Sequence, residues 1–273
     1  MKKIFLITAV SFNLIFSGCI TAEKTAVVQP LTEQNTNETA ETKPIDLENL
    51  KAKVPILIYH HIREISDKDK EKDKQFIVSP ENFEKQLQYL KENDFQNILL
   101  KDLANYFSGN FTLPAKPIII TFDDGLISQY NNALPLLQKY GFTATFFIFT
   151  NPIGRSQNYL NWEQIKELEN FGMEIGSHGI YHLLLNKIDK NRLAEETSGS
   201  KEKIEENLGQ KIYSFAYPFG AYNDQVVKMI KEAGYQSARD IVNGVNHTKE
   251  NLYNLRAYFI TDNFPRFKNI VNQ

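Results

Sequence analysis

The sequence predicts an α/β domain with a mainly parallel sheet, and two observations support this. From Val54 onward, short apolar runs rich in β-branched and aromatic residues alternate with stretches of helical periodicity. Such alternation is typical of βα units. Several helical stretches also end at a glycine, where a helix C-cap needs a left-handed residue. The 273 residues are 42% hydrophobic and 23% charged, which is the mix of a soluble globular domain.

The N-terminus has the pattern of a signal peptide. Lys2 and Lys3 form a positive region, and residues 4–16 form an apolar stretch that is short for a bilayer span. The residues Phe16-Ser17-Gly18-Cys19 resemble a bacterial lipobox, in which Leu is usual at the position of Phe16. This resemblance implies cleavage before Cys19 and a lipid on its sulfur; an ordinary signal peptide with an incidental cysteine is the alternative. Cys19 is the only cysteine, so the monomer can form no internal disulfide.

This interpretation divides the chain into three parts. We expect residues 1–18 to be a lipoprotein signal peptide and residues 19–53 to be the lipidated cysteine with a flexible linker, because this stretch lacks aromatic residues and any sustained apolar period. Residues 54–273 should form the folded domain. The protein should then be exported and lipid-anchored to the cell membrane or the outer membrane, facing the periplasm or the cell exterior.

The elements of the folded domain can be predicted from apolar runs and helix punctuation. We expect strands at residues 55–59, 117–122, 144–149, 173–177 and 213–217. Ser79-Pro80-Glu81 provides an N-cap, a first-turn proline and an early acid for a helix that runs to about Asn93. Further helices are predicted at residues 132–140, 162–171 and 224–233, each followed by a glycine. The alternating charges of residues 67–74 indicate a solvated loop.

Two adjacent carboxylates, Asp123 and Asp124, follow an apolar strand and precede Gly125. Burying two acids there is costly unless a positive group binds them. The C-terminal ends of strands carry the active site in α/β folds, so this position suits a metal ligand and a base. A helix N-cap aspartate followed by a turn glycine is the alternative explanation.

Two histidines, His178 and His182, follow another apolar strand at a spacing of four residues, which places them on one face of a helical turn. Neutral imidazoles joined by a carboxylate make a three-ligand set for zinc or a similar divalent ion, with positions left for water and substrate. The chain contains five histidines, so this pairing beyond a strand end favours a site over a pair of core histidines.

The ordered motifs resemble the polysaccharide deacetylase family with the NodB-homology domain. They are Thr121-Phe122-Asp123-Asp124-Gly125, His178-x-x-x-His182 and Tyr217-Pro218-Phe219-Gly220. The opening Tyr59-His60-His61-Ile62 is similar to the branch that contains the poly-N-acetylglucosamine deacetylases. The resemblance covers residue 54 to the C-terminus. It implies a distorted (β/α) barrel of about seven parallel strands, a divalent metal, and hydrolysis of N-acetyl groups on an N-acetylglucosamine polymer with release of acetate.

The resemblance also implies roles for particular residues. Asp124, His178 and His182 would bind the metal, for which Zn²⁺ is the default, with Co²⁺, Ni²⁺ and Fe²⁺ as alternatives. Asp123 would be the general base. The backbone N–H of Tyr217 would stabilise the oxyanion. His60 would be the general acid that protonates the leaving amine, with a strand-end histidine bonded to backbone as the alternative. We expect His61 and His247 to be structural.

The chain departs from the family pattern at two positions. Ala216 stands where the family usually has an arginine that orients the base, and we expect Arg256 to supply that charge, although a surface arginine is the alternative. Gly179 replaces the usual Ser or Thr after the first ligand histidine, which removes a hydroxyl that could position the site.

The expected partners are an N-acetylated polysaccharide and, through the N-terminal lipid, a membrane. A net charge of −2 provides no basic field for nucleic acid, and we expect a monomer. Two other functions remain open: a catalytically silent polysaccharide-binding lipoprotein, and a deacylase of a non-sugar amide or ester. The sequence leaves open whether the polymer is poly-N-acetylglucosamine, peptidoglycan or chitin-like.

Overall fold

A computed structural model describes residue 47 and residues 49–273. The predicted signal peptide, Cys19 and most of the predicted linker therefore lie outside the described residues. Within the described part, no helix combines the length and the apolar character that a membrane crossing requires.

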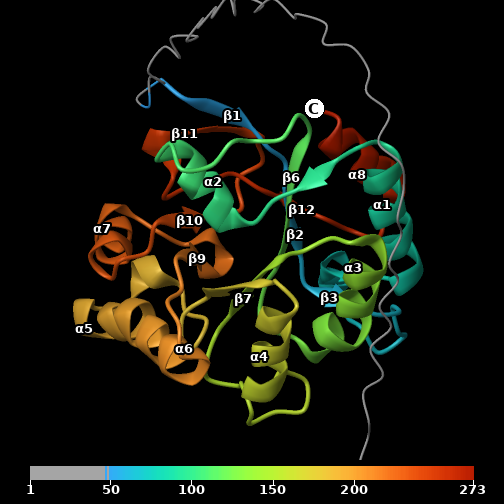
Figure 1. The fold of residues 1–273 in the computed structure, drawn as a ribbon. Helices are drawn as coiled ribbons and strands as arrows, with labels where there is room; N and C mark the ends of the chain where they lie inside the picture. The colour runs from blue at the N-terminus through green and yellow to red at the C-terminus, as the bar shows by residue number, and fades with distance from the viewer. Residues whose placement is uncertain (1–46, 48) are drawn as a thin grey trace, which may run out of the picture. The chain divides into compact units, whose positions relative to one another are not determined.

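A parallel sheet forms the centre of the domain (Figure 1). Seven strands follow one another in the order β10-β9-β8-β7-β6-β2-β12, an eighth short strand, β5, pairs with β6, and every pairing is parallel. The strands are β2 (Ile56–Tyr59), β5 (Gln96–Asn97), β6 (Pro117–Phe122), β7 (Thr145–Ile148), β8 (Glu174–Ser177), β9 (Ser214–Ala216), β10 (Ser237–Arg239) and β12 (Tyr258–Phe259). All five predicted strands are present, and the predicted α/β fold with about seven parallel strands is confirmed.

The C-terminal segment brings the two edges of this sheet together. Leu255 bridges Arg239 on β10, and three residues later β12 pairs with β2. Backbone hydrogen bonds from Asp240 N–H to Leu255 O (2.9 Å) and from Ile260 N–H to Ile58 O (2.9 Å) extend both contacts. The sheet therefore curls into a distorted barrel, as the family resemblance implied.

Side chains alternate between the two faces of the curled sheet, as the pleat requires. Ile58, Ile119 and Phe147 belong to the inner apolar cluster. This cluster also contains Leu100, Leu103 and Phe107. Their neighbours Leu57, Ile120 and Phe146 belong to the outer cluster, which packs against the helices. Both faces are apolar because helices cover the outside, which explains why the strands read as continuous apolar runs.

Helices surround the sheet (Figure 1). They are α1 (Pro80–Glu92), α2 (Leu100–Phe107), α3 (Leu134–Tyr140), α4 (Trp162–Asn170), α5 (Lys190–Ala194), α6 (Ser200–Leu208), α7 (Asp224–Glu232) and α8 (Phe264–Val271). Four of these, α1, α3, α4 and α7, correspond to the predicted helices. Two π-helical turns were not predicted: η2 (Gln129–Ala133) leads into α3, and η4 (Glu195–Gly199) joins α5 to α6.

The structure corrects two boundaries. Strand β1 (Lys51–Lys53) pairs antiparallel with β11 (Asn246–Thr248), so the folded domain begins before Val54 and the predicted linker to residue 53 is too long. Ala52 is buried there between two exposed lysines, a single inward residue that leaves little trace in the composition. The charged stretch of residues 67–74 is not only a loop, since it leads into the 3₁₀ helix η1 (Glu71–Phe76) between the short paired strands β3 (His61–Ile62) and β4 (Ile77–Val78).

Close packing inside the barrel makes a prediction about Gly176 on β8. A Cβ at this position would lie 2.6 Å from Phe147 Cε1 and 2.9 Å from Ser214 O. Gly176→Ala should therefore lower the free energy of unfolding by about 1–3 kcal/mol, measured by urea denaturation. Adding Phe147→Leu should recover part of the loss. A Gly176→Ala variant as stable as the parent protein would contradict this packing.

Candidate metal centre and catalytic cavity

A cavity of about 690 Å³ lies where β2, β6, β8, β9 and β12 end. Its walls combine titratable, aromatic and polar side chains. The lining residues are His60, His61, Arg63, Asp73, Gln75, Phe76, Asp123, Asp124, His178, His182, Tyr217, Phe219, Ile241, Asn243, Phe259, Thr261 and Arg266. The predicted acids and histidines thus meet in one cavity, and the segment that was expected to be only a solvated loop contributes Asp73 to its wall.

Asp124, His178 and His182 form a group that can hold a metal ion, since one ligand atom from each lies within 4.8 Å of the others. The Nε2 atoms of the two histidines are 3.2 Å apart, and Asp124 Oδ1 lies 3.8 Å from His178 Nε2 and 3.5 Å from His182 Nε2. Tetrahedral coordination with bonds of about 2.05 Å has ligand separations of about 3.3 Å. The three atoms therefore fit around one divalent ion.

The hydrogen bond of His178 orients its ring for this role. Its Nδ1 lies 2.6 Å from Ala216 O, and a carbonyl oxygen only accepts, so Nδ1 carries the proton. Nε2 then presents a lone pair to the site. Burial lowers the pKa of His178 to about 3, although the charge of Asp123 acts in the opposite direction, so the ring stays neutral as a metal ligand must.

The strongest evidence for a cation site comes from the carboxylate of Asp124. Its Oδ1 atom is buried and has no hydrogen-bond partner among the described residues. Burial, together with the nearby negative charge of Asp123, raises the pKa of Asp124 to about 7. A carboxylate oxygen without a partner beside two imidazole lone pairs is the arrangement that a bound divalent ion would satisfy.

Asp123 is held apart from this group by Arg239. Arg239 Nη2 donates to both carboxylate oxygens of Asp123 at 2.5 and 2.6 Å, and its side chain is fully buried. Burial alone would raise the pKa of Asp123, but the charge and hydrogen bonds of Arg239 outweigh it and hold this pKa below its usual value. Asp123 is therefore an ionised carboxylate next to the three residues that can hold a metal ion.

The prediction that Arg256 orients Asp123 is corrected by this pairing. Arg256 is exposed, and no hydrogen bond or ion pair joins it to Asp123 within residues 49–273. Arg239 takes this place instead: it is the last residue of β10, which pairs with β9, and its side chain reaches Asp123 after the end of β6. The sequence carried only a weak signal for this, an arginine in the short run Ser237-Ala238-Arg239 after the glycine that follows α7.

His60 packs against two phenylalanine rings at the cavity wall. Its ring centroid is 5.0 Å from that of Phe76 and 5.6 Å from that of Phe259. Burial lowers the pKa of His60 to about 4, although the charge of Asp123 acts in the opposite direction. His61 also lines the cavity, whereas His247 is structural as expected, since its Nε2 lies 2.9 Å from Val54 O.

The oxyanion role predicted for Tyr217 does not fit its hydrogen bonds. The backbone N–H of Tyr217 donates to Arg239 O (3.1 Å) in the pairing of β9 with β10, and its hydroxyl donates to Tyr253 O (2.8 Å). The next residue, Pro218, has no N–H. Phe219 follows with φ of 59°, its ring 4.4 Å from that of His182, and no backbone acceptor for its N–H occurs among the described residues.

Backbone strain is concentrated at this site. Asp124, His182 and Phe219 have φ values of 77°, 55° and 59°, in the left-handed region that residues with a Cβ adopt at a cost of about 1–2 kcal/mol each. Two buried side chains that sequence reasoning missed hold the strained segments. Gln129 Nε2 donates to Asp123 O (2.5 Å) and to His60 O (3.0 Å), and Glu196 accepts hydrogen bonds from the loop between the histidines.

Comparisons with known proteins identify the family of the chain. A model of the family described as polysaccharide deacetylase matches residues 111–238. The chain is 30% identical over 247 residues to the poly-beta-1,6-N-acetyl-D-glucosamine N-deacetylase of Staphylococcus epidermidis, covering 82% of this chain and 84% of that protein.

Solved structures show the same fold. The Streptococcus pyogenes deacetylase PplD, in complex with acetate, superposes with a TM-score of 0.73 at 29% identity, covering 78% of this chain and 95% of that one. BC0361, a polysaccharide deacetylase from Bacillus cereus, gives a TM-score of 0.71 at 30% identity over 81% of this chain and 69% of that one. With this likeness in sequence and fold, and with its acids and histidines gathered in one cavity, the chain belongs to the polysaccharide deacetylase family of amide-bond hydrolases.

Proposed function

We propose that this enzyme removes acetyl groups from N-acetylglucosamine units of a cell-surface polysaccharide and releases acetate, with a divalent metal held by Asp124, His178 and His182. The observation that carries the proposal is a metal-ligand group beside a separate ionised carboxylate in one cavity. The similarity to the S. epidermidis poly-beta-1,6-N-acetyl-D-glucosamine N-deacetylase supports a β-1,6-linked polymer as substrate.

The ligand types favour Zn²⁺, because two imidazole nitrogens and one carboxylate oxygen are its usual partners in catalytic sites. When bound, such an ion acts as a Lewis acid that polarises the acetyl carbonyl and acidifies water. Co²⁺, Ni²⁺ and Fe²⁺ accept the same ligand types.

Asp123 acts as the general base. Arg239 keeps it ionised and fixes its orientation, so that it can take a proton from the attacking water. The backbone N–H of Phe219, rather than that of Tyr217, donates to the oxyanion of the tetrahedral intermediate.

His60 completes the proton transfer. With a pKa of about 4 its imidazole is neutral at pH 7, so it must first gain the proton that the attacking water loses. His60 and Asp123 line the same cavity, so the proton that Asp123 takes from the water passes to His60 within it. His60 then donates this proton to the leaving amine.

The location of the enzyme is part of the proposal. Cys19 would carry the lipid, and the linker after it would hold the monomeric domain near the membrane, where it faces the polysaccharide. Labelling of the full-length protein with a radioactive fatty acid in cells tests this. Cys19→Ser should abolish the label, and a persistent label would contradict lipidation at this residue.

The proposed activity is tested with the full chain and N-acetylglucosamine oligomers. Acetate release should be greatest with β-1,6-linked oligomers, should stop when a chelator removes the metal, and should return when Zn²⁺ is added. Binding of the oligomer with no acetate release in any metal would instead indicate a silent binding protein. Faster release from an acetylated xylan would indicate an esterase.

Substitutions of Asp123 and Asp124 should differ in their effects on metal content. Asp123→Asn should retain metal but lose about 10²–10⁴-fold in kcat, because the base is removed and the ligands remain. Asp124→Ala should lose both metal and activity. Metal content by atomic absorption and acetate release check the pair, and equal metal loss in both variants would refute these roles.

Substitution of Arg239 should change the pH dependence of kcat/KM. Arg239→Gln removes the cation that lowers the pKa of Asp123, so this pKa rises and the acidic limb of the kcat/KM profile should move to higher pH. The same variant should be less stable than the parent protein at pH values above the pKa of an unfolded aspartate, because the ion pair stabilises the native parent protein there. In the parent protein this stabilisation is lost as pH falls through the lowered pKa of Asp123.

Arg256→Ala is the matched control for this experiment. Arg256 is exposed and does not contact Asp123, so its removal should leave the acidic limb in place. A shift of the limb with Arg256→Ala and none with Arg239→Gln would contradict the assignment of Arg239.

A further inference from the structure

The loop of residues 178–182 carries both histidine ligands, and contacts from outside the loop hold its backbone amides. His178 N–H donates to Ile148 O (2.8 Å), and Gly179 N–H donates to Ser177 Oγ (3.1 Å). The two remaining amides before His182, those of Ile180 and Tyr181, both donate to the carboxylate of Glu196.

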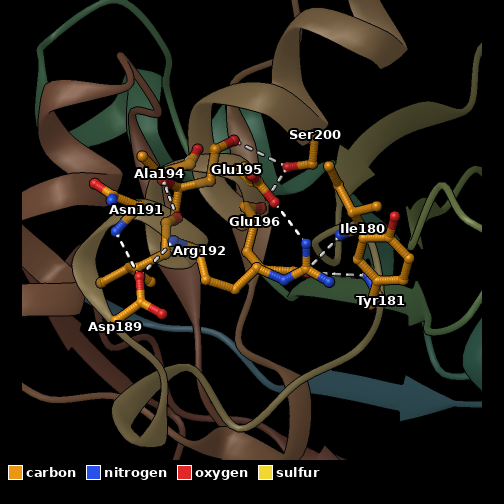
Figure 2. A network of polar contacts seen from close by, with 11 residues as sticks. Ile180, Tyr181, Asp189, Asn191, Arg192, Ala194, Glu195, Glu196 and Ser200 are labelled. Atoms are coloured by element: carbon orange, nitrogen blue, oxygen red, sulfur yellow. Dashed lines mark hydrogen bonds and ion pairs between the residues drawn. The ribbon is translucent and has the colours of Figure 1, made fainter.

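The carboxylate of Glu196 lies beside Ile180 and Tyr181 and accepts hydrogen bonds from both of their backbone amides (Figure 2). Its Oε2 accepts from Ile180 N–H at 2.7 Å and from Tyr181 N–H at 3.1 Å, while Oε1 accepts from Tyr181 N–H at 3.2 Å. The side chain is completely buried. Glu196 comes from the π-helical turn η4, and such turns inside helices occur frequently at functional sites.

Gly179 explains why the acid can approach so closely. Its φ of 85° is left-handed, and a Cβ built there would lie 2.6 Å from Glu196 Oε2. The Ser or Thr that is usual at this position in the family would collide with the carboxylate. The absence of a side chain at Gly179 therefore leaves the space that the Glu196 carboxylate occupies.

Neighbouring residues fix Glu196 and the loop in turn. The Arg192 guanidinium lies over the Tyr181 ring at 4.2 Å, and Arg192 Nε is 4.0 Å from Glu196 Oε1. Ser200 Oγ donates to Glu196 O (2.7 Å) and lies 2.7 Å from Ser177 Oγ. The π-helical turn, the end of β8 and the histidine loop are thus connected through polar contacts.

We propose that Glu196 is a positioning residue that holds the loop of residues 178–182 in the conformation that metal binding requires. The proposal rests on the metal site proposed above. His182 has a left-handed φ of 55°, and the carboxylate holds the two amides that lead to it. Without these bonds, the loop would relax and His182 would leave the ligand position.

The test compares Glu196→Gln with Glu195→Gln. A glutamine is uncharged and has one acceptor oxygen, so its bonds to both loop amides are weaker even when that oxygen takes the place of Oε2, and its amide nitrogen then faces the Tyr181 N–H in place of Oε1. Glu195 is the matched control, since it comes from the same turn but pairs with Arg192 and contacts no loop amide. Two quantities are measured: the Zn²⁺ affinity by calorimetric titration, and hydrogen exchange of the Ile180 and Tyr181 amides in the metal-free protein.

Glu196→Gln should bind Zn²⁺ about 10–100-fold more weakly, and at least one of the two amides should exchange about tenfold faster. Glu195→Gln should change neither. Unchanged Zn²⁺ affinity and exchange in a folded Glu196→Gln protein would overturn the proposal. Failure of the parent protein to bind Zn²⁺ would instead contradict the proposed metal site, while the exchange measurement would still test the contact.

A second set of variants keeps the test decisive if Glu196→Gln does not fold. Gly179→Ala should displace the carboxylate and weaken Zn²⁺ binding, and adding Glu196→Asp, which shortens the acid by one methylene, makes room for the new Cβ. The double variant should bind Zn²⁺ at least as tightly as Gly179→Ala alone. Losses that simply add, as for two independent sites, would overturn the proposal.

Discussion

The buried ion pair between Asp123 and Arg239 is the interaction on which the site depends. It joins the ends of β6 and β10, which are 116 residues apart in sequence, inside the barrel. Burying two charges is costly, and removing one partner leaves the other uncompensated. The pair keeps Asp123 ionised and turned toward Arg239, so that Asp124, the adjacent residue, is left to the two histidines. One contact thus separates the base from the metal ligand.

The strained backbone around the site shows how the fold maintains this arrangement. Asp124 and His182 both have left-handed conformations that only well-anchored neighbours can sustain. In each case the anchor is a buried polar side chain from a π-helical turn: Gln129 from η2 holds Asp123, and Glu196 from η4 holds the histidine loop. Both side chains thus reach the ligand segments from irregular turns of a kind that occurs frequently at functional sites.

Sequence reasoning found the parts of the fold that local patterns encode. Apolar runs and helix caps predicted the five central strands and four helices, and the paired acids and histidines predicted the residues that meet in the cavity. It missed β10, whose three residues carry no period, and therefore chose Arg256, in the strand-like run that leads into β12, over Arg239. It also assigned oxyanion stabilisation to the backbone N–H of Tyr217 from the family resemblance. That N–H is bonded to Arg239 O on β10, a strand that was not predicted. Tertiary pairing, rather than composition, decides these positions.

The proposed catalysis requires one acid and two imidazoles from separate strand ends to bind a single divalent ion. X-ray absorption spectroscopy of the Zn²⁺-loaded protein tests it most directly, since it reports the ligand atoms around the metal. We expect one Zn²⁺ per chain with two imidazole nitrogens and oxygen ligands at about 2.0–2.2 Å. A spectrum without imidazole scattering, or one dominated by sulfur, would contradict it.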